Sequence, residues 1–239
     1  MITCIITMAG RGSRFAPKYG NLPKFMIEVN GQTLFHHSLS SLPLKIIDYF
    51  IFVCRQSDRS LGLEEMIENS ITQKFDVVFL NEVLAGQALS ANSAMHLVDP
   101  RSELIIYNID TKFVSSTLSQ NLRNNDERAS FIGAFIDESE NSHWSFARIK
   151  DDLVIETAEK VKISNYALSG LYHFSAASLF SYGVDWLISH RIKLNSEYFI
   201  APIYNKLIDD GLVVRLDMTS EIFPLGTPAE VSLFGETAL

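Results

Sequence analysis

Short apolar runs, rich in β-branched and aromatic residues, recur along the chain, and segments with helical periodicity separate them. The runs that we expect to be strands are Ile2–Thr7, Tyr49–Cys54, Phe75–Leu80, Leu104–Ile109 and Phe131–Ile136. The segments that we expect to be helices are Thr33–Ser41, Leu61–Ile71, Gln87–Leu97, Val114–Arg123, Ala176–Ser189 and Glu197–Asp209. Strands that alternate with helices are typical of a mainly parallel sheet with helices on both faces. The sequence therefore predicts an α/β fold.

The segment from Trp144 to Phe174 interrupts this alternation. It contains three strand-like pieces, WSFARI, DLVIET and ALSGLYHF, which polar turns separate. We expect a small β insertion that forms one wall of a substrate pocket. In the predicted helix Glu197–Asp209, the apolar pair Tyr198-Phe199 is expected to belong to the core.

Composition restricts the class of protein further. The 239 residues include 28 acidic and 20 basic side chains, a formal net charge of −8, and 47% of them are hydrophobic. This hydrophobic content excludes a disordered chain. The negative total argues against nucleic acids and membranes as partners, because both need clustered positive charge. Without a repeat or a Pro/Gly/Ser-rich linker, one domain over residues 1–239 is expected.

Cysteine and histidine usage argues against several kinds of site. Cys4 and Cys54 are the only cysteines, too few for a disulfide framework or a four-thiolate metal centre, so we expect a reducing, cytoplasmic setting. The six histidines form no cluster with the spacing of zinc ligands. No run approaches the roughly 18 apolar residues that a membrane-spanning helix requires.

A glycine-containing loop directly after the first predicted strand is the strongest local feature. It reads Thr7-Met8-Ala9-Gly10-Arg11-Gly12-Ser13-Arg14-Phe15, and Pro23-Lys24 follows farther along. Ligands of open α/β sheets collect at the carboxyl ends of the strands. Gly10 and Gly12 let the main chain approach phosphate oxygens, and Arg11, Arg14 and Lys24 add positive charge. The loop thus predicts a site for a phosphate chain, with a plain strand-to-helix turn as the alternative.

Two better-known glycine motifs do not fit this loop. Phe15 stands where G-x-G-x-x-G has its third glycine, and Pro17, Gly20 and Pro23 prevent an immediate long helix. A dinucleotide-binding fold is therefore disfavoured. The loop also does not match G-x-x-x-x-G-K-[ST], so a P-loop motor or kinase is not expected.

Taken with three later segments, the loop and Pro23-Lys24 resemble the bacterial sugar-phosphate nucleotidyltransferases, the nucleotide-sugar pyrophosphorylases. In the order that the family shows, these segments are Gly86-Gln87-Ala88, Asn108-Ile109-Asp110, and Glu159-Lys160 followed by Ser164-Asn165-Tyr166-Ala167-Leu168-Ser169-Gly170-Leu171-Tyr172. The resemblance runs from residue 2 to about residue 174, with a weaker match at Gly226-Thr227-Pro228. It implies a three-layer α/β/α Rossmann-like (GT-A-like) fold. The nucleotide-binding part would span about residues 1–110 and the acceptor-binding part about residues 111–239.

The resemblance also implies an activity and the residues that perform it. A nucleoside triphosphate and a phosphorylated acceptor, such as a sugar 1-phosphate, would give a nucleotide-activated product for surface polysaccharide biosynthesis and pyrophosphate, with Mg²⁺ as cofactor. The catalytic residues would be Arg14, Lys24 and Asp110, and Asp110 would also bind the metal. The nucleotide-binding residues would be Met8, Ala9, Gly10, Arg11, Gly12, Ser13, Gly86 and Gln87. The acceptor-binding residues would be Glu159, Lys160, Asn165 and Gly170.

Physical chemistry supports these roles. Nucleotidyl transfer concentrates negative charge around the α-phosphorus, so catalysis is mostly positioning and charge stabilisation. Arg14 would screen the β- and γ-phosphates and Lys24 the α-phosphate, while a carboxylate such as Asp110 suits the hard cation Mg²⁺. Glu159 would accept hydrogen bonds from acceptor hydroxyls, and Lys160 would pair with the acceptor phosphate. Without the resemblance, Asp110 would be an ordinary turn carboxylate and the Glu-Lys pair solvated surface.

One position departs from the family pattern. The family places a second metal-binding aspartate two residues before its final Gly-Thr-Pro, and Pro224 stands there. Either Asp110 and the phosphates hold Mg²⁺ with more water, or Glu221 supplies the second carboxylate, or the chemistry has changed. We expect the first, because Mg²⁺ commonly keeps several waters and few protein ligands.

The sequence leaves three alternatives open. The acceptor could be a phosphorylated alcohol or amine such as choline phosphate, because His143-Trp144-Ser145 replaces the small-residue turn that usually precedes the insertion. Pro224 would also suit a regulatory protein that binds a nucleotide without turnover. A glycosyltransferase is less favoured, because Asn108-Ile109-Asp110 supplies only the second half of an Asp-x-Asp motif. The nucleobase, the acceptor and any homo-oligomer are not determined by the sequence.

Overall fold

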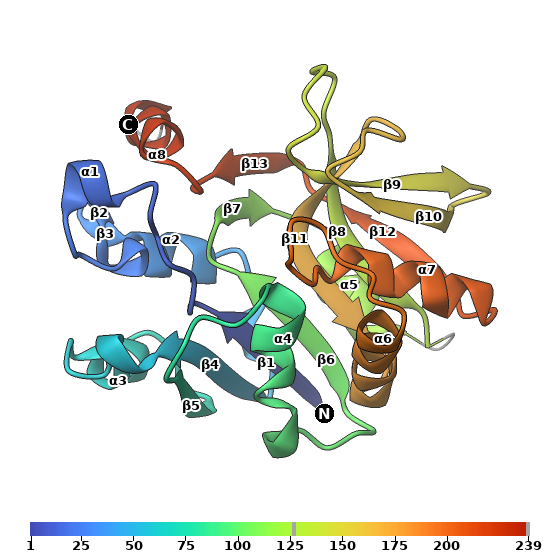
Figure 1. Ribbon diagram of the computed structural model, residues 1–239, viewed down its shortest axis with the longest axis horizontal. Coiled ribbons are helices and arrows are strands. Elements are labelled where there is room, and N and C mark those ends of the chain that lie inside the picture. Colours follow the sequence, from blue (N-terminus) through green and yellow to red (C-terminus); the bar gives the residue numbers. More distant parts are fainter. Residues whose placement is uncertain (126–127, 238–239) are drawn as a thin grey trace.

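The computed structural model describes residues 1–125 and 128–237, and Figure 1 shows the course of the chain. Nine strands form the main sheet: β1 Ile2–Thr7, β4 Tyr49–Arg55, β5 Lys74–Leu80, β6 Glu103–Asn108, β8 Ser130–Ile136, β9 Ser145–Lys150, β10 Leu153–Glu159, β11 Tyr166–Phe174 and β12 Val214–Met218. The strand order is β10-β9-β11-β6-β1-β4-β5, and β8 pairs with both β11 and β12. The five strands predicted outside the insertion all form, within one residue of their predicted bounds.

The centre of this sheet is parallel. β6, β1, β4 and β5 run in the same direction, and Thr7 at the end of β1 lies opposite Val53 and Asn108. The predicted insertion forms β9, β10 and β11, which pair antiparallel with one another, and β11 joins them to β6. The Rossmann-like α/β fold with a mostly parallel central sheet is therefore confirmed.

Helices cover both faces of the sheet. They are α1 Ala16–Tyr19, α2 Leu34–Leu39, α3 Leu63–Glu68, α4 Gln87–Asn92, α5 Leu118–Arg123, α6 Ala177–Ser189, α7 Ala201–Asp209 and α8 Pro228–Thr237. Short 3-10 helices are η1 Lys24–Met26, η2 Leu44–Ile46, η3 Gln56–Asp58 and η4 Met95–Leu97. Side chains of β1 alternate between two cores: Ile5 packs with α4, α6 and α7, whereas Cys4 and Ile6 pack with α2, α3 and α5. This alternation is the period of two that a strand buried on both faces requires.

Two predicted helices begin later than the sequence suggests. Val114, the first residue of the predicted helix Val114–Arg123, instead ends β7 Thr111–Val114, which pairs with β13 Glu221–Pro224, and the helix begins at Leu118. Thr111 and Phe113 are buried while Val114 is exposed, an alternation that suits a strand. The helix predicted from Glu197 begins at Ala201, where Pro202 stabilises the first turn.

The C-terminal helix lies beside the start of the chain. Figure 1 shows α8 next to α1 and close to the hairpin of β2 Glu28–Val29 and β3 Gln32–Thr33. Phe15 is buried in a small apolar cluster with Val231 and Phe234 of α8, and Lys18 Nζ donates to Ser232 Oγ at 3.1 Å. The end of the chain thus supports the loop that follows β1. Within the described residues, none of the helices is long and apolar enough to span a membrane.

Candidate active site

The segment after β1 and the turn after β6 meet above the carboxyl ends of the parallel strands. Lys24, the first residue of η1, donates from Nζ to Oδ1 of Asp110 at 2.5 Å. The Lys24 side chain is 11% exposed and that of Asp110 58% exposed. The ammonium is therefore held under the surface while the carboxylate faces solvent, and residues 86 positions apart in sequence form one charged pair.

The glycine loop exposes its polar residues and anchors its apolar ones. Met8 and Ala9 are buried, and Met8 N donates to the carbonyl of Val53 at 2.8 Å. Arg11 and Arg14 are exposed, and neither forms an ion pair with any described residue. The loop therefore combines a fixed backbone with two cations that can meet an anion from solvent.

A bulge in β11 supports the turn that carries Asp110. The pairing of β11 with β8 shifts register between Leu168 and Tyr172. Gly170 lies in this bulge with φ +90°, and a Cβ there would stand 2.5 Å from Oδ1 of Asn108. Only glycine leaves room for the Asn108 side chain beneath the Asp110 turn. The role of Gly170 in binding an acceptor stays a prediction.

Asp110 is the carboxylate that pairs with Lys24 and the candidate metal ligand of this site. No three His, Cys, Asp or Glu side chains converge anywhere in residues 1–125 and 128–237. Pro224 pairs with Thr111, the residue after Asp110, so the proline lies close to the candidate metal ligand. Glu221 pairs with Val114 at the other end of β7, roughly 10 Å along the strand, which argues against Glu221 as a replacement. One exposed carboxylate fits Mg²⁺ when phosphate oxygens and water complete the coordination.

The start of α4 connects the glycine loop to a distant segment. Gln87 donates from Nε2 to Thr7 Oγ1 at 3.3 Å, which places the predicted nucleotide-binding helix against the end of β1. Gly86 has φ +104°, and a Cβ there would lie 2.3 Å from the carbonyl oxygen of Tyr198. Tyr198 N in turn donates to the carbonyl of Ala85 at 2.8 Å. The close approach of these two backbones requires glycine at position 86.

Glu159, at the end of β10, and Lys160 lie beside a cavity of about 160 Å³. The cavity is lined by Glu159, Ile192, Lys193, Leu194, Phe199 and Pro202. Burial raises the pKa of the Glu159 carboxyl above its ordinary value, although Ser145 Oγ donates a hydrogen bond to it and Lys160 is close. Lys160 Nζ stands 4.8 Å from the ring centroid of Phe199. Asn165, another predicted acceptor residue, is exposed before β11, and its carbonyl accepts from Asp137 N at 2.9 Å.

Residues 3–212 match the family described as nucleotidyl transferase. The chain belongs to the nucleotidyl transferase family. Among solved structures, the nucleoside-diphosphate-sugar pyrophosphorylase from Vibrio cholerae RC9 is similar, with 29% identity over 99% of this chain and 100% of that chain and a TM-score of 0.83. No match to this chain was found among curated proteins.

Two more distant structures share the fold of this nucleotidyltransferase. The inositol-1-phosphate CTP transferase from T. maritima is 18% identical over 98% of this chain and 93% of its own, with a TM-score of 0.78. A UDP-glucose pyrophosphorylase complexed with UDP-glucose is 16% identical over 100% of this chain and 98% of its own, with a TM-score of 0.80. At this identity the likeness shows the fold alone.

The loop before α7 of the nucleotidyltransferase contains candidate site residues that the sequence did not indicate. Tyr198 and Phe199, expected in a helical core, lie half-buried in this loop instead. Tyr198 still packs against the core, whereas Phe199 lines the Glu159 cavity. The available signals were Pro202, which marks the start of a helix, and the turn-forming pair Asn195-Ser196. Read together, they would have placed an exposed loop here.

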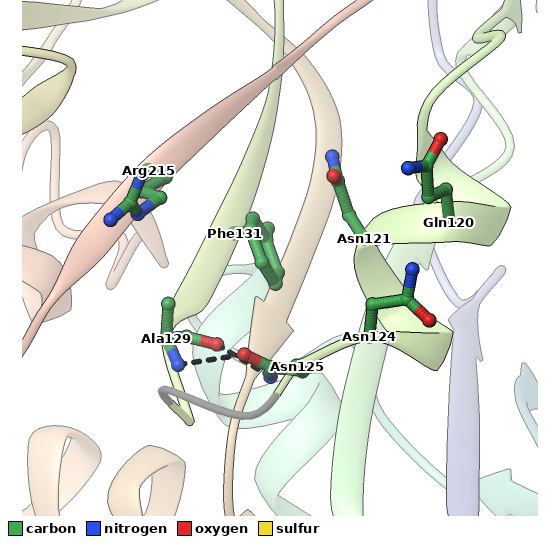
Figure 2. A pocket seen from close by; sticks show the side chains of 7 residues that line it. All are labelled: Gln120, Asn121, Asn124, Asn125, Ala129, Phe131 and Arg215. Atoms are coloured by element: carbon green, nitrogen blue, oxygen red, sulfur yellow. Dashed lines mark hydrogen bonds between the residues drawn. The ribbon is translucent and has the colours of Figure 1, made fainter.

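A second hollow, of about 340 Å³, lies at the opposite end of the sheet. Its lining residues are Gln120, Asn121, Asn124, Asn125, Ala129, Phe131 and Arg215. Figure 2 shows that the Asn125 amide is hydrogen-bonded to the backbone of Ala129, and that Phe131 lies between Arg215 and the carboxamides of Gln120 and Asn121. Phe131 stands at the start of β8, which runs parallel to β6, whereas Asp110 follows the end of β6. The hollow is therefore separate from the predicted site.

Proposed function

We propose that this nucleotidyltransferase couples a nucleoside triphosphate to a sugar 1-phosphate and releases pyrophosphate in an Mg²⁺-dependent reaction. The observation that carries the proposal is the 2.5 Å pair of Lys24 and Asp110, which lies beside a glycine loop with two exposed arginines. The pair supplies both charges that a polyphosphate site needs, a cation for phosphate and a carboxylate for a metal ion. The Vibrio cholerae structure, described as a nucleoside-diphosphate-sugar pyrophosphorylase, supports sugar phosphates as the acceptor class.

The geometry suggests a role for each charged residue. An oxygen of the acceptor phosphate attacks the α-phosphorus, the new P–O bond forms, and the bond to the oxygen bridging the α- and β-phosphorus breaks. Pyrophosphate leaves with that electron pair. Lys24 would exchange Asp110 for the α-phosphate and neutralise its growing charge, while Arg11 and Arg14 bind the β- and γ-phosphates. Asp110 would hold Mg²⁺, which supplies further neutralisation of the polyphosphate when bound.

The test is pyrophosphate release from purified protein. Each common nucleoside triphosphate is paired with a panel of sugar 1-phosphates and phosphorylated alcohols, with MgCl₂ or with excess EDTA. We expect one triphosphate and one acceptor class to give pyrophosphate only when both substrates and Mg²⁺ are present. Pyrophosphate release that does not depend on the acceptor, or that continues in excess EDTA, would contradict the proposal.

Phosphorylated alcohols belong in the panel because a structure with this fold is described as an inositol-1-phosphate CTP transferase. A cytidylyltransferase acting on such an acceptor would share the phosphate chemistry and differ only in the acceptor cavity.

We further propose that the product serves surface polysaccharide biosynthesis and that the protein is cytoplasmic. The two cysteines, buried and unpaired, support a reducing compartment.

Pro224 favours a second candidate function. Because proline stands where the resemblance predicts a second carboxylate, the protein could bind a triphosphate as a regulatory signal without turnover. Calorimetric titration with a triphosphate and MgCl₂ separates the candidates. Binding without pyrophosphate release for any acceptor would support the regulatory protein and reject the enzyme.

A further inference from the structure

The cavity at Glu159 is mostly apolar. Ile192, Leu194, Phe199 and Pro202 line it, and Glu159 and Lys193 are its charged members. An apolar cavity of about 150 Å³ is known to accommodate a six-membered ring, and this one measures about 160 Å³. One ring, or the end of a small molecule, therefore fills it.

This cavity is connected to the predicted reaction centre by a series of direct contacts. Asn108, in the strand before the Asp110 turn, pairs in register with Thr7. Thr7 accepts a hydrogen bond from Gln87, and the backbone before Gln87 is bonded to Tyr198. Phe199, the next residue, lines the cavity. The nucleotide side and the apolar wall are thus joined by a short series of direct contacts.

The wall is held in one shape by a tight turn. Leu194 and Glu197 exchange backbone hydrogen bonds of 3.0 and 2.9 Å. The two residues between them, Asn195 and Ser196, have φ of 49° and 68°, as a type I′ turn requires. A wall fixed in this way discriminates between ligands by shape and polarity instead of adapting to each.

We infer that the 192–202 wall selects an acceptor whose buried end is poor in hydroxyl groups, deoxygenated or methyl-bearing, with one hydroxyl or amino group donating to Glu159. The inference rests on the proposed function and names the acceptor class within it. Hydroxyls placed against Ile192, Leu194 and Phe199 would lose water without gaining a partner. Glu159 already accepts one hydrogen bond from Ser145, and its carboxylate keeps positions at which it can accept another from the acceptor.

The experiment compares acceptors that differ by single hydroxyl groups. We would measure kcat/KM for glucose 1-phosphate and for its 3-deoxy, 4-deoxy and 6-deoxy analogues with the most productive triphosphate. At least one deoxy analogue should be preferred by roughly 10- to 100-fold, the range that a hydrophobic pocket achieves for a small group. The inference is overturned when no analogue exceeds glucose 1-phosphate.

Two substitutions in the 192–202 wall test whether the wall causes the preference for a deoxy acceptor. Leu194→Asn and Ile192→Thr add polar partners at half-buried positions, so the preference should fall below about threefold. Leu61→Asn, a matched change at an exposed residue after η3, should retain it. A preference that survives both wall variants would assign the selectivity to another part of the molecule and overturn the inference.

The two proposals fail in distinguishable ways. Equal pyrophosphate release from all four acceptors rejects the selective wall and leaves nucleotidyl transfer standing. If no acceptor gives pyrophosphate, the proposed function fails, and the wall is tested by saturation-transfer difference NMR with the same four acceptors. Stronger binding of a deoxy analogue, lost in Leu194→Asn, would support the wall, and equal binding would reject it.

Discussion

The nucleotide side and the acceptor side of the candidate site are built differently. The nucleotide side consists of contiguous pieces, the loop after β1 and the turn after β6, at the ends of adjacent parallel strands. The acceptor side combines the end of β10, Ser145 of β9 and the loop before α7. Phosphate recognition needs backbone N–H groups and charges, which short motifs provide. A cavity of defined shape needs walls from several elements, so its residues are scattered along the sequence.

The largest expected effect tests the nucleotide side. Asp110→Asn removes the carboxylate that pairs with Lys24 and that would hold Mg²⁺, so pyrophosphate release should fall roughly 10²- to 10³-fold, as for other lost electrostatic groups in active sites. Asp152→Asn, at the exposed turn between β9 and β10, is the matched control and should leave the rate unchanged. If the rate of pyrophosphate release by Asp110→Asn stayed within about threefold of the wild-type rate, Asp110 would have no catalytic role.

The next largest effect is a loss of stability, expected where the nucleotide side contacts the acceptor side at Gly86. Gly86→Ala introduces a Cβ 2.3 Å from the Tyr198 carbonyl at φ +104°, so the free energy of unfolding should fall by about 1–3 kcal/mol. Gly10→Ala meets no atom within 4 Å and should change it by less than about 0.5 kcal/mol. Urea unfolding of both variants measures the difference. Equal losses would mean that the loop before α7 is not tightly joined to α4.

The acceptor side should show a pH dependence of stability through Glu159. Burial raises its pKa in the folded protein, so the folded state holds this proton more tightly than the unfolded state. The associated stability is present below the ordinary pKa of glutamate and is lost as the pH rises through the folded pKa. In Glu159→Gln the side chain cannot ionise, so this decrease in stability with rising pH should be absent.

Urea unfolding at several pH values between about 4 and 8 would check this prediction. The stability of Glu159→Gln relative to wild type should increase with pH above the ordinary glutamate pKa and then level off. A relative stability that is flat, or that decreases with pH, would show that Glu159 is not desolvated in the cavity. Glu156→Gln, at a more exposed position on the same strand, serves as the control.

The smallest expected effect concerns the turn that fixes the acceptor wall. Ser196 has φ 68°, so Ser196→Gly should relieve strain and raise the free energy of unfolding by about 0.5 kcal/mol, after the added entropy of the unfolded glycine. Ser116→Gly, at an exposed bend without positive φ, should produce no gain. A loss of stability in Ser196→Gly would argue that the serine side chain itself holds the turn.

Much of the fold could be predicted from local pattern. The five strands are confirmed within one residue because buried strands have uninterrupted apolar runs, as in Ile2–Thr7. The helix predicted from Val114 was wrong at its start, because the pairing of β7 with β13 overrides local helical preference. The division into a nucleotide-binding and an acceptor-binding part stays a prediction, as do the catalytic and binding roles of individual residues.

The sequence by itself determined the strands, the glycine loop and the candidate pair Lys24 and Asp110, because strand patterns and phosphate-binding loops depend on neighbouring residues. Only the tertiary structure decided that Lys24 lies 2.5 Å from Asp110, that Glu221 pairs with the end of β7 farther from Asp110, and that Phe199 lines a cavity instead of a helical core. These outcomes depend on strand register and on packing between distant segments. Such contacts cannot be predicted from local periodicity. Each of them joins residues far apart in the sequence, and the residues around each partner are compatible with several other tertiary contacts.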